Sequence, residues 1–463
     1  MSILVFRLSE SAKRECILKK GINLRKRGGF IMAQELEKRP GHTRWYISSL
    51  LSSMIILNYF DRVAISVAAP AIQDSFQLTA TQLGVVFSIY TYSYTLMHLP
   101  VGSLLDRFGV AWVTRIGMTI WSLLTVILAF LHGKLLLYIV RFLIGLTSAS
   151  AFPAASKATA LWFPPNERGL ANSLFDSAAK FANVIGAPLV AFLVTTYDWR
   201  TAFLTIGIMN ICFTIFFWWY YEQPDRHKLV SKEELHYIQK HNAVSTEKIS
   251  ERTMDALKTM ITNRKAWGLM IGFTGYGYTF NLLLTWLPTF FKETYGLDIM
   301  SSGLFTAVPW LISTISGIIV GGWLVDTLIK KGHSNTKVYQ TIIVIGMSLG
   351  FAFLGAIFTH NIIIAIICIS VGLAGISATA PIGWSISADI APSGSISLLS
   401  SMVNLANNLF GGIIAVSLTG YLFDMTGSFT LSFLVAGFVL LLGLVFYLAV
   451  LGDIEQIQVS KRK

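Results

Sequence analysis

The sequence predicts an all-α integral membrane protein with twelve transmembrane helices in two pseudo-symmetric six-helix bundles. Hydrophobic residues make up 54% of the 463 residues and charged residues only 13%, against roughly 25% charged in an average soluble domain. Apolar runs of about 20 residues, the length that crosses a bilayer, recur along the whole chain. A single long polar interruption, at 222–266, divides these runs six and six.

The apolar runs define the spans in chain order. The polar interruption is the expected cytoplasmic linker between an N-terminal bundle, 46–221, and a C-terminal bundle, 267–451. Within it, the pattern at 231–238 predicts a capped amphipathic helix at the membrane surface. The expected spans are 46–70, 83–105, 111–131, 135–157, 169–194, 200–221, 267–291, 301–325, 338–358, 361–386, 395–422 and 429–451.

Basic residues predict the orientation of these spans. Residues 1–45 form a basic N-terminal tail and 452–463 a short C-terminal tail. Outside the spans, only Lys134, Arg200 and Lys292 fall on the face opposite the tails. This bias predicts a multi-pass protein of the cell (inner) membrane with both termini cytoplasmic. It also accounts for the net charge of +12 without a nucleic-acid partner. Because no span or signal peptide precedes it, we expect Met32 to be the native start.

Charged residues inside the apolar spans are the main functional signal. Asp61 and Arg62 stand side by side within the apolar segment 45–72, and Arg141 lies in the fourth span. Either charge at mid-membrane costs roughly 2.5–3.5 kcal/mol on insertion scales, so such residues usually mark a binding or ion-coupling site. Two structural alternatives stay open. Asp61 and Arg62 could neutralise each other, and Arg141 could extend to the membrane surface.

The two halves share a motif at the same place in each six-span unit. Gly102 to Gly109, with Asp106 and Arg107, closes the second span, and Gly322 to Asp326 closes the eighth. An acid at a helix end can pair with a facing helix terminus or a cation. We therefore expect Asp106, Arg107 and Asp326 to act in gating, with alternating access by rocking of one half against the other.

With these motifs the chain resembles the major facilitator superfamily, since Gly102 to Gly109 matches its loop between spans two and three. Several stretches resemble its anion:cation symporter branch, which takes up organic and sugar acids. They are Asn58-Tyr59-Phe60-Asp61-Arg62, 141–146, Phe152-Pro153, 162–173, Thr285-Trp286-Leu287-Pro288, and Asn404, Asn407 and Asn408 with Gly411-Gly412. The resemblance implies proton-coupled import of an aldonate, aldarate or hexuronate.

Arg62 and Arg141 are the expected core of the substrate site. The planar guanidinium fork matches a carboxylate, so two arginines can hold an organic anion and fix its orientation. The resemblance implies the same roles. Asp61 is the expected proton carrier, because burial favours its neutral form whereas nearby arginines favour the charged form. The alternative is that Asp61 is a permanent structural partner of Arg62.

Ser148 departs from the sugar-acid branch, which typically carries a glutamate seven residues after the arginine of span four. Asp176 and Lys180 appear instead on span five at helical i,i+4 spacing. They could neutralise each other, Lys180 could add a cation to the anion site, or Asp176 could handle the proton. The departure leaves the coupling ion and stoichiometry open.

Uncharged polar and aromatic residues supply the remaining substrate contacts. For each of them ordinary helix packing is the competing explanation, but a polyhydroxy acid would satisfy the cluster of asparagines. The candidates are Tyr59, Tyr94, Tyr276, Asn281, Trp286, Trp384, Asn404, Asn407 and Asn408.

Other functions are disfavoured by missing motifs. No Gly-Lys-Ser/Thr loop is present, which argues against ATP-driven transport. The cysteines and histidines show no metal spacing, and no acid or nucleophile cluster suggests a membrane enzyme. We therefore expect no cofactor and no metal, a small organic anion and a proton as partners, and a monomer in the lipid bilayer. An anion exchanger or a drug exporter of the same fold is the alternative.

Overall fold

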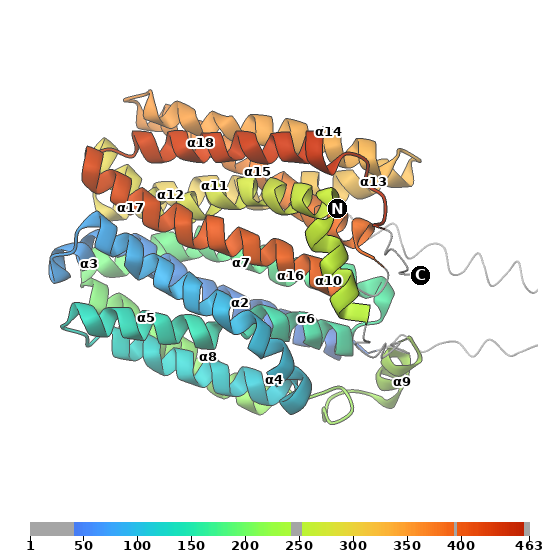
Figure 1. The fold of residues 1–463 in the computed structure, drawn as a ribbon. Helices are drawn as coiled ribbons and strands as arrows, with labels where there is room; N and C mark the ends of the chain where they lie inside the picture. Colours follow the sequence, from blue (N-terminus) through green and yellow to red (C-terminus); the bar gives the residue numbers. More distant parts are fainter. Residues whose placement is uncertain (1–40, 242–251, 393–395, 458–463) are drawn as a thin grey trace, which may run out of the picture. The chain divides into compact units, whose positions relative to one another are not determined.

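The computed structural model describes residues 41–241, 252–392 and 396–457, which lie within one compact unit, Gly41–Lys463. Figure 1 shows long helices running side by side, with α9 and α10 at one end of the bundle, here named the linker end. The opposite end, where α3 lies, is named the distal end. The helices are α2 (Thr43–Val67), α3 (Ala69–Phe76), α4 (Ala80–Leu128), α5 (Lys134–Ser148), α6 (Ala151–Trp162), α7 (Pro165–Thr196), α8 (Trp199–Tyr220), α9 (Lys232–His241), α10 (Arg252–Thr262), α11 (Arg264–Tyr295), α12 (Ile299–Ile318), α13 (Val325–Lys330), α14 (Asn335–Gly350), α15 (Ile362–Ile390), α16 (Ile396–Ala406), α17 (Ala415–Thr426) and α18 (Thr430–Val445).

Ten helical segments of the described chain are long and apolar enough to cross a membrane. The other two expected spans, 83–105 and 267–291, are also helical, within α4 and α11. Spans two and three are two helices, labelled together as α4, that meet at a kink at Gly109, where φ is 79°. That left-handed backbone suits glycine, which lacks the Cβ that would clash. The predicted membrane fold of twelve helices is therefore present.

Short π-helical stretches interrupt three spans of the second half. They are Ile319–Leu324 between α12 and α13, Asn407–Ile414 between α16 and α17, and Phe446–Leu451 after α18. A π-helical turn widens the helix locally and is frequent at functional sites. The middle stretch begins at Asn407, one of the predicted substrate residues.

Side-chain caps fix helix ends where the chain turns at the distal end. Asp198 accepts a hydrogen bond from the backbone N–H of Thr201 (2.6 Å), and Asp298 accepts one from Ser301 (2.9 Å). Each supplies a partner for a donor that the first helical turn leaves free. Hydrogen bonds from Thr201 also lower the pKa of Asp198.

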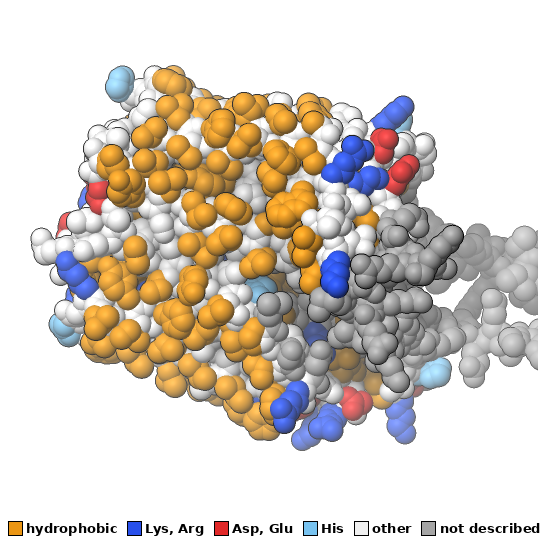
Figure 2. Space-filling view, in the orientation of Figure 1, with side chains coloured by type: hydrophobic (Ala, Val, Ile, Leu, Met, Phe, Trp, Pro, Cys, Tyr) orange, Lys and Arg blue, Asp and Glu red, His pale blue; other side chains and the backbone are white. Residues whose placement is uncertain are grey.

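Hydrophobic side chains cover the middle of the face shown in Figure 2, and charged side chains gather towards the two ends. This is the distribution of a surface in contact with lipid along its middle. Large hydrophobic side chains that the structure exposes include Ile120, Phe192 and Phe438. The chain is therefore a multi-pass membrane protein, as the sequence predicts.

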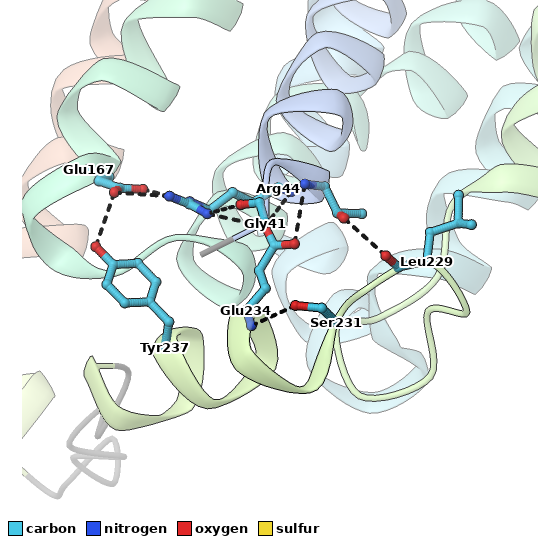
Figure 3. A network of polar contacts seen from close by, with 8 residues as sticks. Gly41, Arg44, Glu167, Leu229, Ser231, Glu234 and Tyr237 are labelled. Carbon is cyan, nitrogen blue, oxygen red and sulfur yellow. Dashed lines mark hydrogen bonds and ion pairs between the residues drawn. The ribbon is translucent and has the colours of Figure 1, made fainter. Parts of the chain in front are cut away.

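A buried charge cluster ties the linker to the N-terminal bundle (Figure 3). The Arg44 cluster consists of Arg44, Glu167, Glu234 and Tyr237, which come from α2, α7 and α9. Arg44 Nε lies 2.8 Å from Glu167 and its Nη1 lies 3.1 Å from Glu234. Tyr237 donates its hydroxyl to Glu167 at 3.1 Å. Arg44, which the sequence placed in the basic tail, is thus a buried structural residue.

Glu234 also caps α2 from the linker side. Its carboxylate accepts hydrogen bonds from the backbone N–H groups of Thr43 (3.3 Å) and Arg44 (3.1 Å). An anion at a helix N-terminus interacts favourably with the helix dipole. Helix α9 corresponds to the predicted amphipathic segment. Through Glu234 it contacts the start of the first span.

Hydrogen bonds join the two halves at the distal end. Asp424 at the end of α17 accepts from the backbone N–H groups of Ala80 (2.8 Å) and Thr81 (2.6 Å) at the start of α4. Ser66 of α2 donates to the Thr285 carbonyl of α11 at 2.6 Å. Each bond connects the N-terminal bundle with the C-terminal bundle. The distal end is therefore closed in this structure.

Candidate anion site

Arg62 lies inside a cage of three tyrosines. Its guanidinium carbon is 4.7 Å from the ring centre of Tyr59 and 4.8 Å from those of Tyr90 and Tyr94. The Nε of Arg62 donates to the Tyr90 hydroxyl at 3.0 Å. Cation–π contacts stabilise a guanidinium without neutralising its charge. The cage therefore orients Arg62 and leaves its positive charge available to an anion.

Arg141 of α5 contacts the ring of the same tyrosine, Tyr90. Its guanidinium carbon is 4.8 Å from the ring centre of Tyr90, and the residue is only 2% exposed. Arg62 and Arg141 both line one small cavity of about 40 Å³ between the halves. Its other walls come from α2, α4, α11, α17 and the π-helical stretch of span eleven, through Ile65, Phe87, Tyr90, Thr91, Asn281, Leu284, Thr285, Gly412 and Val416.

Both arginines keep buried donors without a partner. Among the described residues, Arg62 Nη2 and Arg141 Nε make no hydrogen bond. No ion pair within 4.0 Å joins either arginine to an acid in the described parts of the chain. Buried charges are normally paired, since desolvation without compensation is costly. The cavity is thus lined by two buried cations that have no acidic partner among the described residues.

Asp61 faces away from the cavity, into the interior of the N-terminal bundle. It is 2% exposed and accepts hydrogen bonds from Thr125 Oγ1 (3.2 Å) and Asn210 Nδ2 (3.2 Å). Adjacent helical residues point about 100° apart, so Asp61 and Arg62 face different neighbours. The carboxylate still interacts electrostatically with Arg141 and, more weakly, with Arg62. The sequence alternative of a direct Asp61–Arg62 pair is absent from these described residues.

The structure brings several predicted substrate residues together. Tyr59 and Tyr94 belong to the cage of Arg62, and Asn281 lines the cavity from the C-terminal half. Asn281 Nδ2 donates to the Gly277 carbonyl one turn earlier, at 2.9 Å, and that bond holds its side chain. Tyr276 is buried on the same helix and packs against Phe280 at 5.3 Å.

Other predicted substrate residues lie outside the cavity. Trp286 is fully buried and donates its indole N–H to the Val416 carbonyl at 3.1 Å. Trp384 packs on Phe273 with ring centres 4.9 Å apart. Both have well-defined packing partners, and no wall of the cavity is formed by either.

The three asparagines of span eleven divide between two arrangements. Asn408 Nδ2 donates to Asn404 Oδ1 at 2.8 Å, so these two satisfy each other in part. Asn407 fills the space left by the missing side chain of Gly277, and its Oδ1 is buried without a partner among the described residues. Of the three, Asn407 is thus the one with an unmet polar atom.

Asp176 and Lys180 form the ion pair that their spacing predicts. Lys180 Nζ lies 3.4 Å from Asp176 Oδ2, with the lysine side chain 10% exposed and the acid 52%. Lys180 also reaches Gly317 of α12 in the other half. The cavity of the two arginines does not include this pair. Ser148, at the position of the family glutamate, is buried, and its hydroxyl has no partner within the described chain.

The predicted gating residues are described only in part. The side chains of Asp106 and Asp326 lie outside the described residues, although their backbones are helical in α4 and α13. Arg107 is exposed, with its guanidinium carbon 5.2 Å from the Phe108 ring centre. In the described residues no group of three His, Cys, Asp or Glu side chains could hold a metal ion.

Sequence reasoning missed the residues that connect the site. Tyr90 contacts both arginines, Thr125 and Asn210 donate hydrogen bonds to Asp61, and Asp424 joins the two halves at the distal end. Two signals were available. Asn210 is a polar residue within an apolar span, and Tyr90 precedes Tyr94 by one helical turn.

The model of the Major Facilitator Superfamily matches residues 51–416, most of the chain. The chain belongs to the major facilitator superfamily. As a member of this superfamily it is a transporter and not an enzyme, which confirms the family prediction from the sequence. A solved bacterial homologue of the human lysosomal transporter Spinster, in an inward-facing and occupied conformation, shares the fold with a TM-score of 0.72. That similarity covers 88% of this chain and 96% of the other at 16% identity.

Curated relatives of this superfamily member include named transporters. The uncharacterized transporter YybO of Bacillus subtilis is 82% identical over 93% of this chain and 99% of its own length. The probable galactarate/D-glucarate transporter GarP of Escherichia coli K12 is 29% identical over 92% of this chain and 98% of its own. The probable sulfoacetate transporter SauU of Cupriavidus necator is 31% identical over 87% of this chain and 92% of its own.

Proposed function

We propose that this transporter imports an organic anion of the sugar-acid class by proton symport with alternating access across the cell membrane. The observation that carries the proposal is the shared cavity of Arg62 and Arg141, whose guanidinium groups have no acidic partner within the described part of the chain. A carboxylate there would accept the donors that the protein leaves free. The names of the galactarate/D-glucarate and sulfoacetate relatives support the same class of substrate.

Charge balance favours a dianion over a monoanion. The two arginines carry two positive charges, and Asp61 interacts with both of them. When Asp61 is protonated, a substrate with two negative charges neutralises the site. Galactarate, glucarate and sulfoacetate each carry two acidic groups, whereas an aldonate carries one. Proton binding to Asp61 and dianion binding to the arginines are then coupled through Arg141.

Substrate entry requires a wider cavity than the one described. Its volume of about 40 Å³ has room for a few water molecules at roughly 10–15 Å³ each, not for a six-carbon acid. The halves would therefore part at the linker end to admit or release substrate, while the Asp424 and Ser66 bonds hold the distal end. This is the rocking motion that two related bundles permit.

Uptake into proteoliposomes tests the proposal. Labelled galactarate, glucarate, sulfoacetate and an aldonate would be compared with and without an inward proton gradient. We expect accumulation of a dianion that depends on the gradient. Transport that does not depend on the proton gradient but requires an anion inside the vesicle would instead support the exchanger alternative.

A further inference from the structure

A second, wider hollow lies at the linker end of the N-terminal bundle, where α4 bends and α8 ends. Its volume is about 470 Å³. The side chains that matter here are Arg107, Trp112 and Arg115 of α4, and Glu222, Gln223 and Arg226 after α8. It is named the Arg115 hollow. It shares no wall with the cavity of Arg62 and Arg141.

The Arg115 hollow carries an excess of positive charge. Among the described side chains that line it, three arginines face one acid, Glu222, and Arg226 also has Asp225 within 4.0 Å. Arg115 is 7% exposed, and its Nη2 donates to the carbonyls of Trp218 (3.0 Å) and Tyr221 (2.6 Å) and to Glu222 (2.8 Å). Its Nε is buried without a partner among the described residues. A buried, unpartnered donor of a charged group calls for an acceptor such as a phosphate oxygen.

Two exposed tryptophans frame the hollow. Trp112 and Trp218 meet edge to face with ring centres 5.7 Å apart, and the Arg115 guanidinium lies 6.0 Å and 5.4 Å from their rings. They are 54% and 39% exposed. Tryptophan is enriched where a membrane protein meets the headgroup layer. The hollow is therefore at the level of lipid headgroups.

An exposed apolar stripe leads from the hollow along α4 towards the distal end. It consists of Trp112, Ile116, Ile120, Leu123 and Ile127, each between 42% and 54% exposed. The spacing of three and four residues places them on one face of the helix. A face of this kind accommodates acyl chains. A single ligand with an anionic head and apolar chains would fit the hollow and the stripe together, which free phosphate would not.

We propose that the Arg115 hollow binds the phosphate headgroup of an anionic phospholipid from the leaflet at the linker end. The phosphate accepts from Arg115 Nε and pairs with Arg107 and Arg226. The acyl chains lie along the stripe that begins at Trp112. Basic pockets between spans bind anionic headgroups by the same chemistry.

Native mass spectrometry of the full-length protein in detergent tests this site. Dioleoyl phosphatidylglycerol would be titrated against dioleoyl phosphatidylcholine, which has the same chains, and against inorganic phosphate. We expect retention of phosphatidylglycerol well above phosphatidylcholine, and no displacement by phosphate. Each basic residue near an anionic lipid contributes about fivefold in affinity, so Arg107→Gln/Arg226→Gln should weaken retention by about tenfold or more.

The matched control removes two charges from the same end of the molecule. Lys228→Gln/Lys232→Gln alters exposed residues outside the hollow and should leave retention unchanged. Trp112→Ala should reduce retention without changing net charge. Arg115 itself is left intact, because it holds the end of α8 through the Trp218 and Tyr221 carbonyls. Equal retention by the arginine variant and the control, or by the two lipids, would overturn the proposal. So would displacement by phosphate.

Discussion

Two buried arginine clusters of this transporter differ in how completely they are paired. In the Arg44 cluster, one guanidinium contacts two carboxylates, Glu167 and Glu234, and is 4% exposed. In the cavity between the halves, Arg62 and Arg141 contact tyrosine rings and retain donors with no partner in the described chain. Both clusters bury charge, but only the first is satisfied by the protein itself.

The difference separates a structural role from a binding role. Removing one member of a satisfied buried pair leaves an uncompensated charge, so it destabilises the fold. Removing an arginine that has no acidic partner among the described residues leaves no carboxylate uncompensated, so the loss of stability should be smaller. Replacing a charged residue should therefore lower the stability of the fold in the Arg44 cluster, and lower transport in the cavity of Arg62 and Arg141.

The largest loss of transport is expected from the unpaired arginines. Arg62→Ala and Arg141→Ala should each abolish uptake, because the substrate would be left with half its partners at a cost of about 2–5 kcal/mol. The loss of folding stability should be smaller than in the Arg44 cluster. Proteoliposome uptake and thermal unfolding of the same preparations would measure both. Lys292→Ala, which removes a partly exposed cation paired with Glu293 at the distal end, is the control and should behave as wild type. Near-normal uptake by either arginine variant would remove that residue from the site.

The next largest effect is expected at Asp61, on the coupling of substrate transport to the proton gradient. Asp61→Asn keeps the shape of the side chain and mimics its protonated form, so substrate binding should survive. Proton-driven accumulation should fall to simple equilibration across the membrane, whereas counterflow exchange persists. Asp74→Asn changes an exposed acid and should leave accumulation intact. Accumulation that persists in Asp61→Asn would place the proton on another residue.

Substitutions in the Arg44 cluster should lower the stability of the fold. Glu234→Ala leaves Arg44 buried with one carboxylate and removes the cap of α2, so it should cost about 3–5 kcal/mol. The double variant Arg44→Met/Glu234→Met should cost less than the single one. Thermal unfolding checks both, with Glu293→Ala, a partner in a surface ion pair, as the near-neutral control. A single variant as stable as wild type would contradict the structural assignment of this cluster.

The smallest effect is expected at Asp176 and Lys180. Lys180 contacts one acid, whereas Arg44 contacts two and Arg62 and Arg141 contact none among the described residues. The pair is long at 3.4 Å, and half of the acid side chain is exposed, so its free energy is of the order of 0.2–1 kcal/mol. Asp176→Asn should lower transport a fewfold by leaving Lys180 uncompensated. Asp176→Asn/Lys180→Gln should recover much of it. A dead double variant beside an active Lys180→Gln would instead assign proton handling to Asp176.

The sequence by itself determined the membrane fold, its twelve helices and its unusual charges. Apolar runs are local signals, and their length is set by the thickness of the bilayer. A charge in such a run is conspicuous because of its solvation cost, so Asp61, Arg62 and Arg141 could be found without a structure. The asparagines and tryptophans were harder to rank, because polar residues in spans also serve helix packing.

Only the tertiary structure decided which groups meet. The interior of the N-terminal bundle turns Asp61 towards Thr125 and Asn210, whereas Arg62 turns into a tyrosine cage and shares a cavity with Arg141. Tertiary packing also places Arg44 in a buried cluster, although the sequence alone suggests one more basic residue of the tail. These contacts join residues far apart in the chain. They depend on the rotation and packing of each helix, which a helical pattern in one segment cannot specify.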